Sequence, residues 1–106
     1  MACAAALVAL EICSDPQLLA SVRELGERLR RALAELPGVA AVRGRGLICA
    51  IDLRYPASAP ELARRALLEQ RLVVNATGPA TIRLEPPLIV TAREIDDAVA
   101  RIAKMA

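Results

Sequence analysis

The chain has 106 residues, a formal net charge of +2 and no histidine. This length suits one domain, and a composition that is 56% hydrophobic and 25% charged argues against disorder. Without histidine, this chain alone cannot build a Ser-His-Asp or Cys-His nucleophile or a histidine-containing zinc site. Lys104, the sole lysine, lies two residues from the end of the chain, which is a poor place for a Schiff-base lysine.

The first elements predicted along the chain are two helices. Residues 3–13 are apolar nearly all round, which predicts a buried helix that something outside this small domain helps to cover. The stretch is too short to span a membrane and has no basic residues before it. A second helix is predicted from a cap at Ser14 to Pro37-Gly38. Its apolar stripe consists of Leu18, Val22, Leu25, Leu29, Leu33 and Leu36.

The remaining sequence alternates strands and helices. Residues 39–53 predict two strands joined at Gly44-Arg45-Gly46, and residues 55–59 predict a connector containing Pro56. Ser58 and Thr91 each begin a capping-box pattern ahead of a helix, and strands are predicted at 72–75 and 81–84. The order is therefore ααββαββα. It predicts an α+β fold, in which a small, mostly antiparallel sheet of about four strands has helices packed on one face.

Charge and cysteine content favour no separate chemistry. Most arginines lie beside glutamates in helical segments and Tyr55 is the only aromatic, so solvated ion pairs are favoured over nucleic-acid binding. Cys3, Cys13 and Cys49 are an odd number, lack metal-ligand spacing and lie in apolar surroundings. They are interpreted as reduced, buried thiols of a cytoplasmic protein, and no metal site is predicted.

Several short sequence motifs, taken in chain order, resemble those of a known protein family. They are Ala2-Cys3-Ala4-Ala5-Ala6-Leu7, Val42-Arg43-Gly44-Arg45-Gly46-Leu47, Leu72-Val73-Val74-Asn75, Gly78-Pro79 and Ile82-Arg83-Leu84-Glu85-Pro86-Pro87-Leu88. Together they resemble the C-terminal part of class III pyridoxal-phosphate-dependent aminotransferases, and within them the acetylornithine members. The ornithine members are also similar, and succinylated substrates are used by related enzymes.

The resemblance implies a role within a larger enzyme. The family is homodimeric, uses pyridoxal phosphate and transfers an amino group from N-acetylornithine to 2-oxoglutarate in arginine biosynthesis. Its cofactor-binding residues lie in a large domain upstream of the matched strings. Residues 1–13 are accordingly expected to be a helix from the inter-domain connection, and residues 14–106 the small domain. Met1 stands where the family has Gly-Asn-Pro, so the chain is expected to begin at a domain seam and to be inactive alone.

The resemblance assigns a functional role to one residue of this chain. Arg83 matches the arginine that binds the substrate carboxylate, and a guanidinium can grip a carboxylate through two parallel hydrogen bonds. Paired with a glutamate, Arg83 would instead be structural. Asn75 and Thr77 are expected near the substrate entrance, and Arg43 and Arg45 in structural roles near the domain interface. The chain departs from the family at Cys49-Ala50 and at Glu85, which places an acid two residues from Arg83 and so bears on substrate choice.

Two other interpretations remain open. The chain could be a stand-alone α+β module that senses amino acids or binds another protein, although common modules of this size begin with a strand. It could also be a nonfunctional gene remnant. Tight binding of small amino acids or oxo acids would favour the sensor, because half an active site should bind weakly.

Overall fold

The computed structural model describes residues 1–54 and 58–106, so the predicted connector around Pro56 lies outside the described residues. The described elements follow the predicted order and confirm the α+β class. They are α1 (Ala2–Cys13), α2 (Pro16–Ala34), β1 (Val39–Arg45), β2 (Ile48–Leu53), α3 (Ala59–Gln70), β3 (Asn75–Ala76), β4 (Thr81–Leu84) and α4 (Ala92–Ala103).

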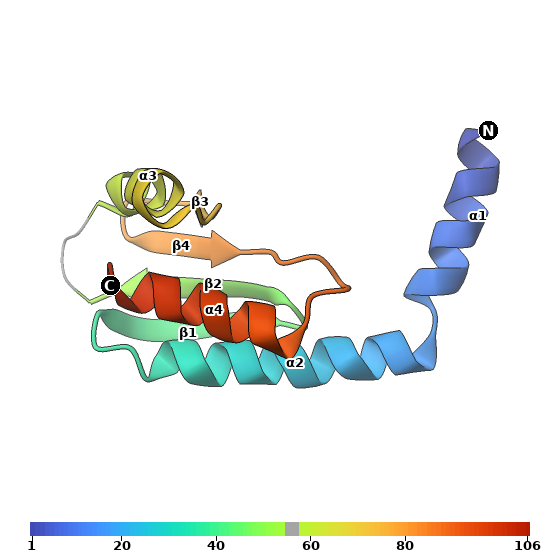
Figure 1. The fold of residues 1–106 in the computed structure, drawn as a ribbon, viewed down its shortest axis with the longest axis horizontal. Helices are drawn as coiled ribbons and strands as arrows, with labels where there is room; N and C mark the ends of the chain where they lie inside the picture. Colours follow the sequence, from blue (N-terminus) through green and yellow to red (C-terminus); the bar gives the residue numbers. More distant parts are fainter. Residues whose placement is uncertain (55–57) are drawn as a thin grey trace.

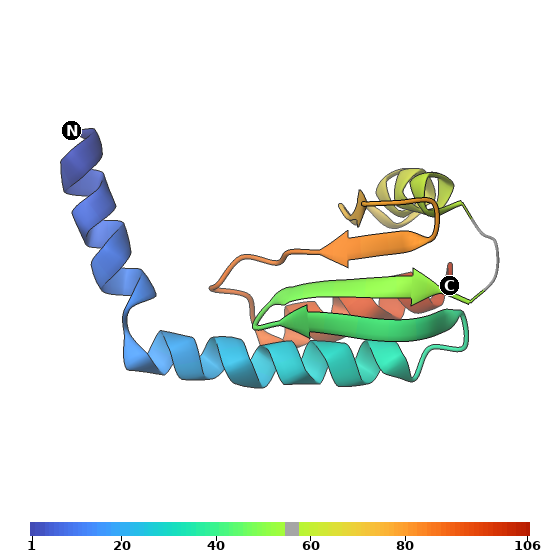
Figure 2. The ribbon, with the colours of Figure 1, turned by 180° about the vertical axis from the view of Figure 1, so that it is seen from behind.

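The strands form one antiparallel sheet in the order β1-β2-β4-β3. Helices α2 and α4 lie side by side across one face of this sheet, and α3 packs beside β3 and β4 (Figure 1). Seen from behind, the strands lie in front of α4, α2 runs along the edge beside β1, and no helix crosses this face of the sheet (Figure 2). The prediction of helices on one face is therefore confirmed, and one face of the sheet is left open.

The core lies between the sheet and the helices. Alternate residues of β2 and β4 point to the helix side and are buried, as strand geometry requires. With them pack two leucines of α2 and two isoleucines of α4. The set is Leu29, Leu33, Cys49, Ile51, Leu53, Ile82, Leu84, Ile95 and Ile102. Burying each such side chain contributes roughly 1.5–3 kcal/mol. The apolar residues between the sheet and the helices are therefore the main source of stability for residues 16–106.

Helix α1 forms where it was predicted, and the described chain does not supply its cover. None of its residues is buried, and it projects away from the sheet at the end of α2 (Figure 1). The side chains of Leu7, Val8, Leu10 and Ile12 are 54–65% exposed. Within the described residues no single helix is long and apolar enough to cross a membrane; α1 and α2 pass that test only as a pair bent by 64°. Nothing in the described chain covers the apolar surface of α1.

Helix caps follow the sequence with one correction. Asp15 caps α2, because its carboxylate accepts hydrogen bonds from the backbone N–H groups of Gln17 and Leu18 at 3.4 and 3.3 Å. Ser14, the predicted cap, instead ends α1 and donates its own backbone N–H to Leu10. Ser58 caps α3 through the N–H of Glu61, and Thr91 forms a complete capping box with Glu94.

The third strand is shorter than predicted. Only Asn75–Ala76 pairs with β4, and residues 72–74 form no ladder. Asn75 lies opposite Arg83, so continuing that register would place Leu72 opposite Pro86. Pairing stops before that point, since Val74 and Val73 would face Leu84 and Glu85 and form no ladder either; Pro86, which has no N–H, could not extend it. In the first hairpin Arg45 still belongs to β1, and the turn needs the left-handed backbone of Gly46, whose φ is 56°.

The cysteine prediction is confirmed for one residue and wrong for two. Cys49 is buried in the core, and burial raises the pKa of its thiol. Cys3 and Cys13 are exposed, because both lie on α1, which the rest of the chain does not cover.

Candidate functional site

The open face of the sheet gathers the polar residues of the strands. The strand register aligns Arg43, Ala50, Arg83 and Asn75 across all four strands. A neighbouring row aligns Ala41, Asp52 and Thr81. The residues between them in sequence, such as Ile51 and Ile82, point to the core. Because Ala50 is small, the side chains of Arg43 and Arg83 are not separated by a bulky neighbour.

Arg83 is held loosely on this face. Its Nε lies 3.1 Å from Oε1 of Glu85, and the two side chains are 39% and 48% exposed. The contact is an ion pair, but its angles do not make a hydrogen bond: in the described part of the chain, Arg83 Nε is the buried side-chain nitrogen left without a hydrogen-bond partner. Leaving a buried N–H without a hydrogen-bond partner is costly.

A pocket of about 160 Å³ is lined by Val73, Val74, Asn75, Arg83 and Glu85. Its walls combine a cation, an acid, an amide and two apolar side chains. A guanidinium such as that of Arg83 can bind a small carboxylate through two parallel hydrogen bonds. Asn75 lies directly opposite Arg83, so the structure brings these two predicted residues together.

Thr77 does not join them. It follows β3, its side chain is exposed, and its backbone N–H donates to the carbonyl of Thr81 at 3.0 Å, which closes the loop between β3 and β4. It does not line the pocket that contains Arg83 and Asn75.

Arg43 is engaged in a structural network. It donates to Asp52, which also accepts a hydrogen bond from the Thr81 hydroxyl at 2.7 Å. The hydrogen bonds from Arg43 and then Thr81 hold the pKa of Asp52 below its ordinary value, and the same pairing raises the pKa of Arg43. The network ties β1, β2 and β4 together on the open face. Arg45 ends β1 and is exposed beside the turn.

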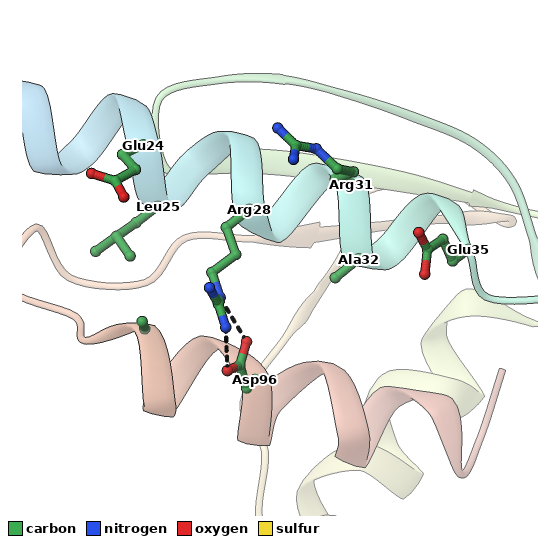
Figure 3. Close-up of a pocket in the computed structure, with 8 residues that line it drawn as sticks. Glu24, Leu25, Arg28, Arg31, Ala32, Glu35 and Asp96 are labelled. Atoms are coloured by element: carbon green, nitrogen blue, oxygen red, sulfur yellow. Dashed lines mark hydrogen bonds and ion pairs between the residues drawn. The ribbon is translucent and has the colours of Figure 1, made fainter.

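A larger groove between α2 and α4 has different properties. It encloses about 520 Å³ and is lined by acids and arginines of both helices (Figure 3). Arg28 reaches across it to Asp96 with two hydrogen bonds of 2.8 and 2.7 Å, whereas Arg31 points away from Asp96 (Figure 3). The two side chains that bridge the groove, Arg28 and Asp96, are already paired with each other. This ion pair links α2 to α4.

A covalently held cofactor finds no anchor in this part of the chain. Lys104 is the C-cap residue of α4 and is exposed. Within the residues that the structure describes there is no group of three histidine, cysteine or acidic side chains able to hold a metal ion.

Comparison with known proteins places this fold and open face in a family. Residues 1–106 match the family described as aminotransferase class-III. The chain is 40% identical over 99 residues to acetylornithine aminotransferase of Bifidobacterium longum, covering 92% of this chain and 22% of that protein. It is 39% identical over 104 residues to ornithine aminotransferase of Bordetella pertussis, covering 97% and 25%.

Solved structures agree with the sequence matches. The crystal structure of acetylornithine aminotransferase from Elizabethkingia anophelis superposes with a TM-score of 0.85 at 35% identity, over 98% of this chain and 27% of that one. The chain therefore belongs to the class III aminotransferase family, and it spans about a quarter of the length of the relatives it matches.

Two features of the site escaped the sequence analysis. The sequence predicted a strand at Val73 and Val74. In the structure β3 begins only at Asn75, and the two valines line the pocket instead. Asp52 was not singled out, although an acid in an otherwise apolar strand is a signal for a partner across the sheet. Which arginine it pairs with depends on the register, which places it on the same face as Arg43 and Thr81.

Proposed function

We propose that this chain is the C-terminal small domain of an aminotransferase that moves the amino group of N-acetylornithine to 2-oxoglutarate in arginine biosynthesis. In this role the domain binds the substrate carboxylate and closes the active site. It is inactive without the large domain.

Arg83 carries the proposal. Its Nε is buried and lacks a hydrogen-bond partner, and Arg83 is one of the residues that line a small pocket at β3 and β4. A carboxylate would satisfy that nitrogen and the neighbouring guanidinium N–H together. Asn75, opposite on β3, adds a second polar contact. Thr77 is retained as a residue of the entrance loop, outside the pocket itself.

Helix α1 supports the division into residues 1–13 and 14–106. Its apolar surface is bare, while every other helix buries residues in the core of the chain. We assign the cover to the large domain of the same enzyme, which would lie in the three quarters of the relatives that this chain does not span. That domain would also hold pyridoxal phosphate, since the side chains described here do not fit the cofactor. The whole enzyme is proposed to be a cytoplasmic homodimer.

The test is a chimera in which this chain replaces the matching segment of the Bifidobacterium longum enzyme. The chimera should transaminate N-acetylornithine with 2-oxoglutarate, and the 106-residue chain alone should not. Arg83→Ala should lower kcat/KM by roughly a hundredfold, because two hydrogen bonds to a charged group are together worth about 3 kcal/mol.

Arg93→Ala provides the matched control, since Arg93 is an exposed arginine of α4 on the far side of the sheet. It should leave kcat/KM within about twofold. Circular dichroism of the Arg83→Ala chain should show the parent helix content. Equal rates for the Arg83→Ala and parent chimeras would refute the role of Arg83, and turnover by the isolated chain would refute its predicted inactivity.

Calorimetry distinguishes the alternative of a stand-alone sensor. Amino acids and 2-oxo acids should bind the isolated chain with millimolar dissociation constants or weaker, because half an active site should bind weakly. A dissociation constant in the micromolar range would instead support a sensor.

A further inference from the structure

A second exposed apolar surface lies apart from helix α1. In the loop between β4 and α4, the side chains of Leu88 and Ile89 are 41% and 79% exposed, and Val73, just before β3, is 81% exposed. Single exposed apolar residues are ordinary, whereas a contiguous group of them marks an interaction surface. These three residues, together with the groove beside them, are called the loop surface below.

The groove joins these side chains to the core. It encloses about 360 Å³ between the segment before β3, the loop after β4 and α4. Val73 lines it, as do Pro86 and Pro87, the residues next to Leu88. Its lining is apolar apart from two glutamates. An apolar groove with a few acids resembles the buried centre and polar rim of a protein interface.

The groove is open because β3 and β4 stop pairing early. Asn75 pairs with Arg83, but Val73 and Val74 form no ladder with the residues that follow β4. The two segments therefore enclose space in place of a continued sheet, and apolar side chains line that space. Apolar surface left in water forgoes the free energy of burial, so a partner that fills the groove is favoured.

The loop surface lies toward the side of the molecule on which α1 projects. Figures 1 and 2 show the loop between β4 and α4 reaching toward that side. Helices α1 and α2 are bent from each other by 64°, so α1 and the loop face a common space above the start of α2. A body in this space would contact both apolar surfaces at once.

We propose that the loop surface is a second docking surface for the large domain of the same enzyme, which sits between α1 and the loop. This inference rests on the proposed function and extends the contact of the large domain beyond α1. About three quarters of the relatives lies outside the match to this chain, which is ample polypeptide to fill the space. The apolar lining sets the chemistry of the partner: it inserts an aliphatic or aromatic side chain into the groove.

Helix α3 offers an internal control. Leu67 and Leu68 are 53% and 65% exposed, which is comparable with Leu88 and Ile89. They lie on α3, at the end of the body away from α1 (Figure 1). The large domain should therefore cover the loop surface and leave these two leucines exposed.

The first test is hydroxyl-radical footprinting of the chimera, read by mass spectrometry. The oxidation rate of each side chain is divided by its rate in a proteolytic digest of the same protein. The ratio for Leu88 and Ile89 should be roughly fivefold below that for Leu67 and Leu68, since a side chain at the centre of an interface keeps little exposed area. Equal ratios for the two pairs would overturn the inference.

Paired substitutions provide a second measurement. Leu88→Gln with Ile89→Gln should lower the Tm of the chimera by about 5 °C or more, whereas Leu67→Gln with Leu68→Gln should lower it by less than about 2 °C. Glutamine keeps the approximate length of the side chains and is a good helix former, so α3 is not penalised. Equal Tm values for the two double variants would contradict the proposal.

A photoreactive benzophenone side chain at position 89 identifies the occupant. The cross-link should form within one chain of the chimera, to a peptide of the large domain. A cross-linked band at twice the mass of the chain would show that a second copy covers the loop surface, and would overturn the assignment.

The failure of this inference is distinguishable from failure of the proposed function. Protection of Leu88 and Ile89 in a chimera that does not transaminate would refute the proposed function alone. A chimera that transaminates while Leu88 and Ile89 oxidise as readily as the α3 leucines would refute this inference alone.

Discussion

Helices α1 and α2 follow each other in the chain, yet they are stabilised in different ways. Helix α2 is amphipathic, and it buries Gly26, Leu29 and Leu33 against the sheet and α4. Helix α1 is apolar nearly all round and buries nothing. A helix of 12 residues is marginal in water without packing, so α1 relies on its alanine-rich sequence while α2 relies on the core.

The difference shows what apolar composition does and does not specify. A stripe of leucines at helical spacing specifies which face meets a core, and α2 meets one in its own chain. An all-round apolar surface specifies only that several sides need cover. The described chain supplies none of that cover for α1, so the apolar composition of α1 does not by itself say what it packs against.

The largest expected effect comes from making the same substitution in both helices. Leu33→Ala in α2 removes a side chain with 0% exposure and should lower the free energy of unfolding by about 2–5 kcal/mol. Leu10→Ala in α1 removes one that is 63% exposed and should change it by less than about 0.5 kcal/mol. Urea unfolding of the isolated chain, followed by circular dichroism, measures both.

A large cost for Leu10→Ala would break the comparison. It would mean that α1 is packed in solution, against a second copy of the chain. That packing would appear as unfolding midpoints that rise with protein concentration.

A second prediction tests how closely α2 approaches the sheet. Gly26→Ala should destabilise the chain by about 1–3 kcal/mol, even though alanine is the better helix former by about 1 kcal/mol. The added Cβ would lie 2.0 Å from the backbone oxygen of Gly46, so helix or hairpin must move. Thermal unfolding of the variant measures the net effect.

Gly78→Ala is the matched control for this change. Its added Cβ would meet nothing within 4 Å, so the variant should be as stable as the parent or slightly more stable. A stabilised Gly26→Ala variant would show that helix propensity, rather than close packing, decides the stability of α2.

The sequence predicted the elements and their order because most of them carry local signals. The capping box at Thr91, the serine cap at Ser58 and the alternation in β2 all act within a few residues of where they are read. The N-cap of α2 moved from Ser14 to Asp15, since two neighbouring residues could each cap and only the backbone path decides between them.

The candidate site was predictable only in part. Arg83 and Asn75 stand in recognisable strings, but their meeting across β3 and β4 depends on the register. Strand β3 is only two residues long, and no local signal in residues 72–74 marks where its pairing with β4 stops. The loose contact of Glu85 with Arg83, in contrast to the tight pairing of Arg43 with Asp52, depends on side-chain angles that no spacing rule supplies.

The smallest expected effect concerns ion pairs, which also distinguish α1 from α2 and the rest of the described chain. The ion pairs of the described chain run from Glu27 to Arg101, and α1 takes part in none of them. Asp52 should contribute stability that is full above its ordinary pKa of 3.8 and is lost as the pH falls through its lowered folded-state pKa. The free energy of unfolding should therefore fall more steeply below about pH 4 in the parent than in Asp52→Asn.

A graded series makes this prediction specific to the network on the open face. Thr81→Val removes the weaker of the two hydrogen-bond donors that lower the pKa of Asp52 and leaves Arg43 in place. Its acid sensitivity should therefore lie between those of the parent and Asp52→Asn, as measured by urea unfolding at a series of pH values. Identical pH dependence in all three proteins would mean that Asp52 has the same pKa in the folded and unfolded chain. The pairing of Arg43 with Asp52 would then be an exposed contact that does not hold β1 to β2.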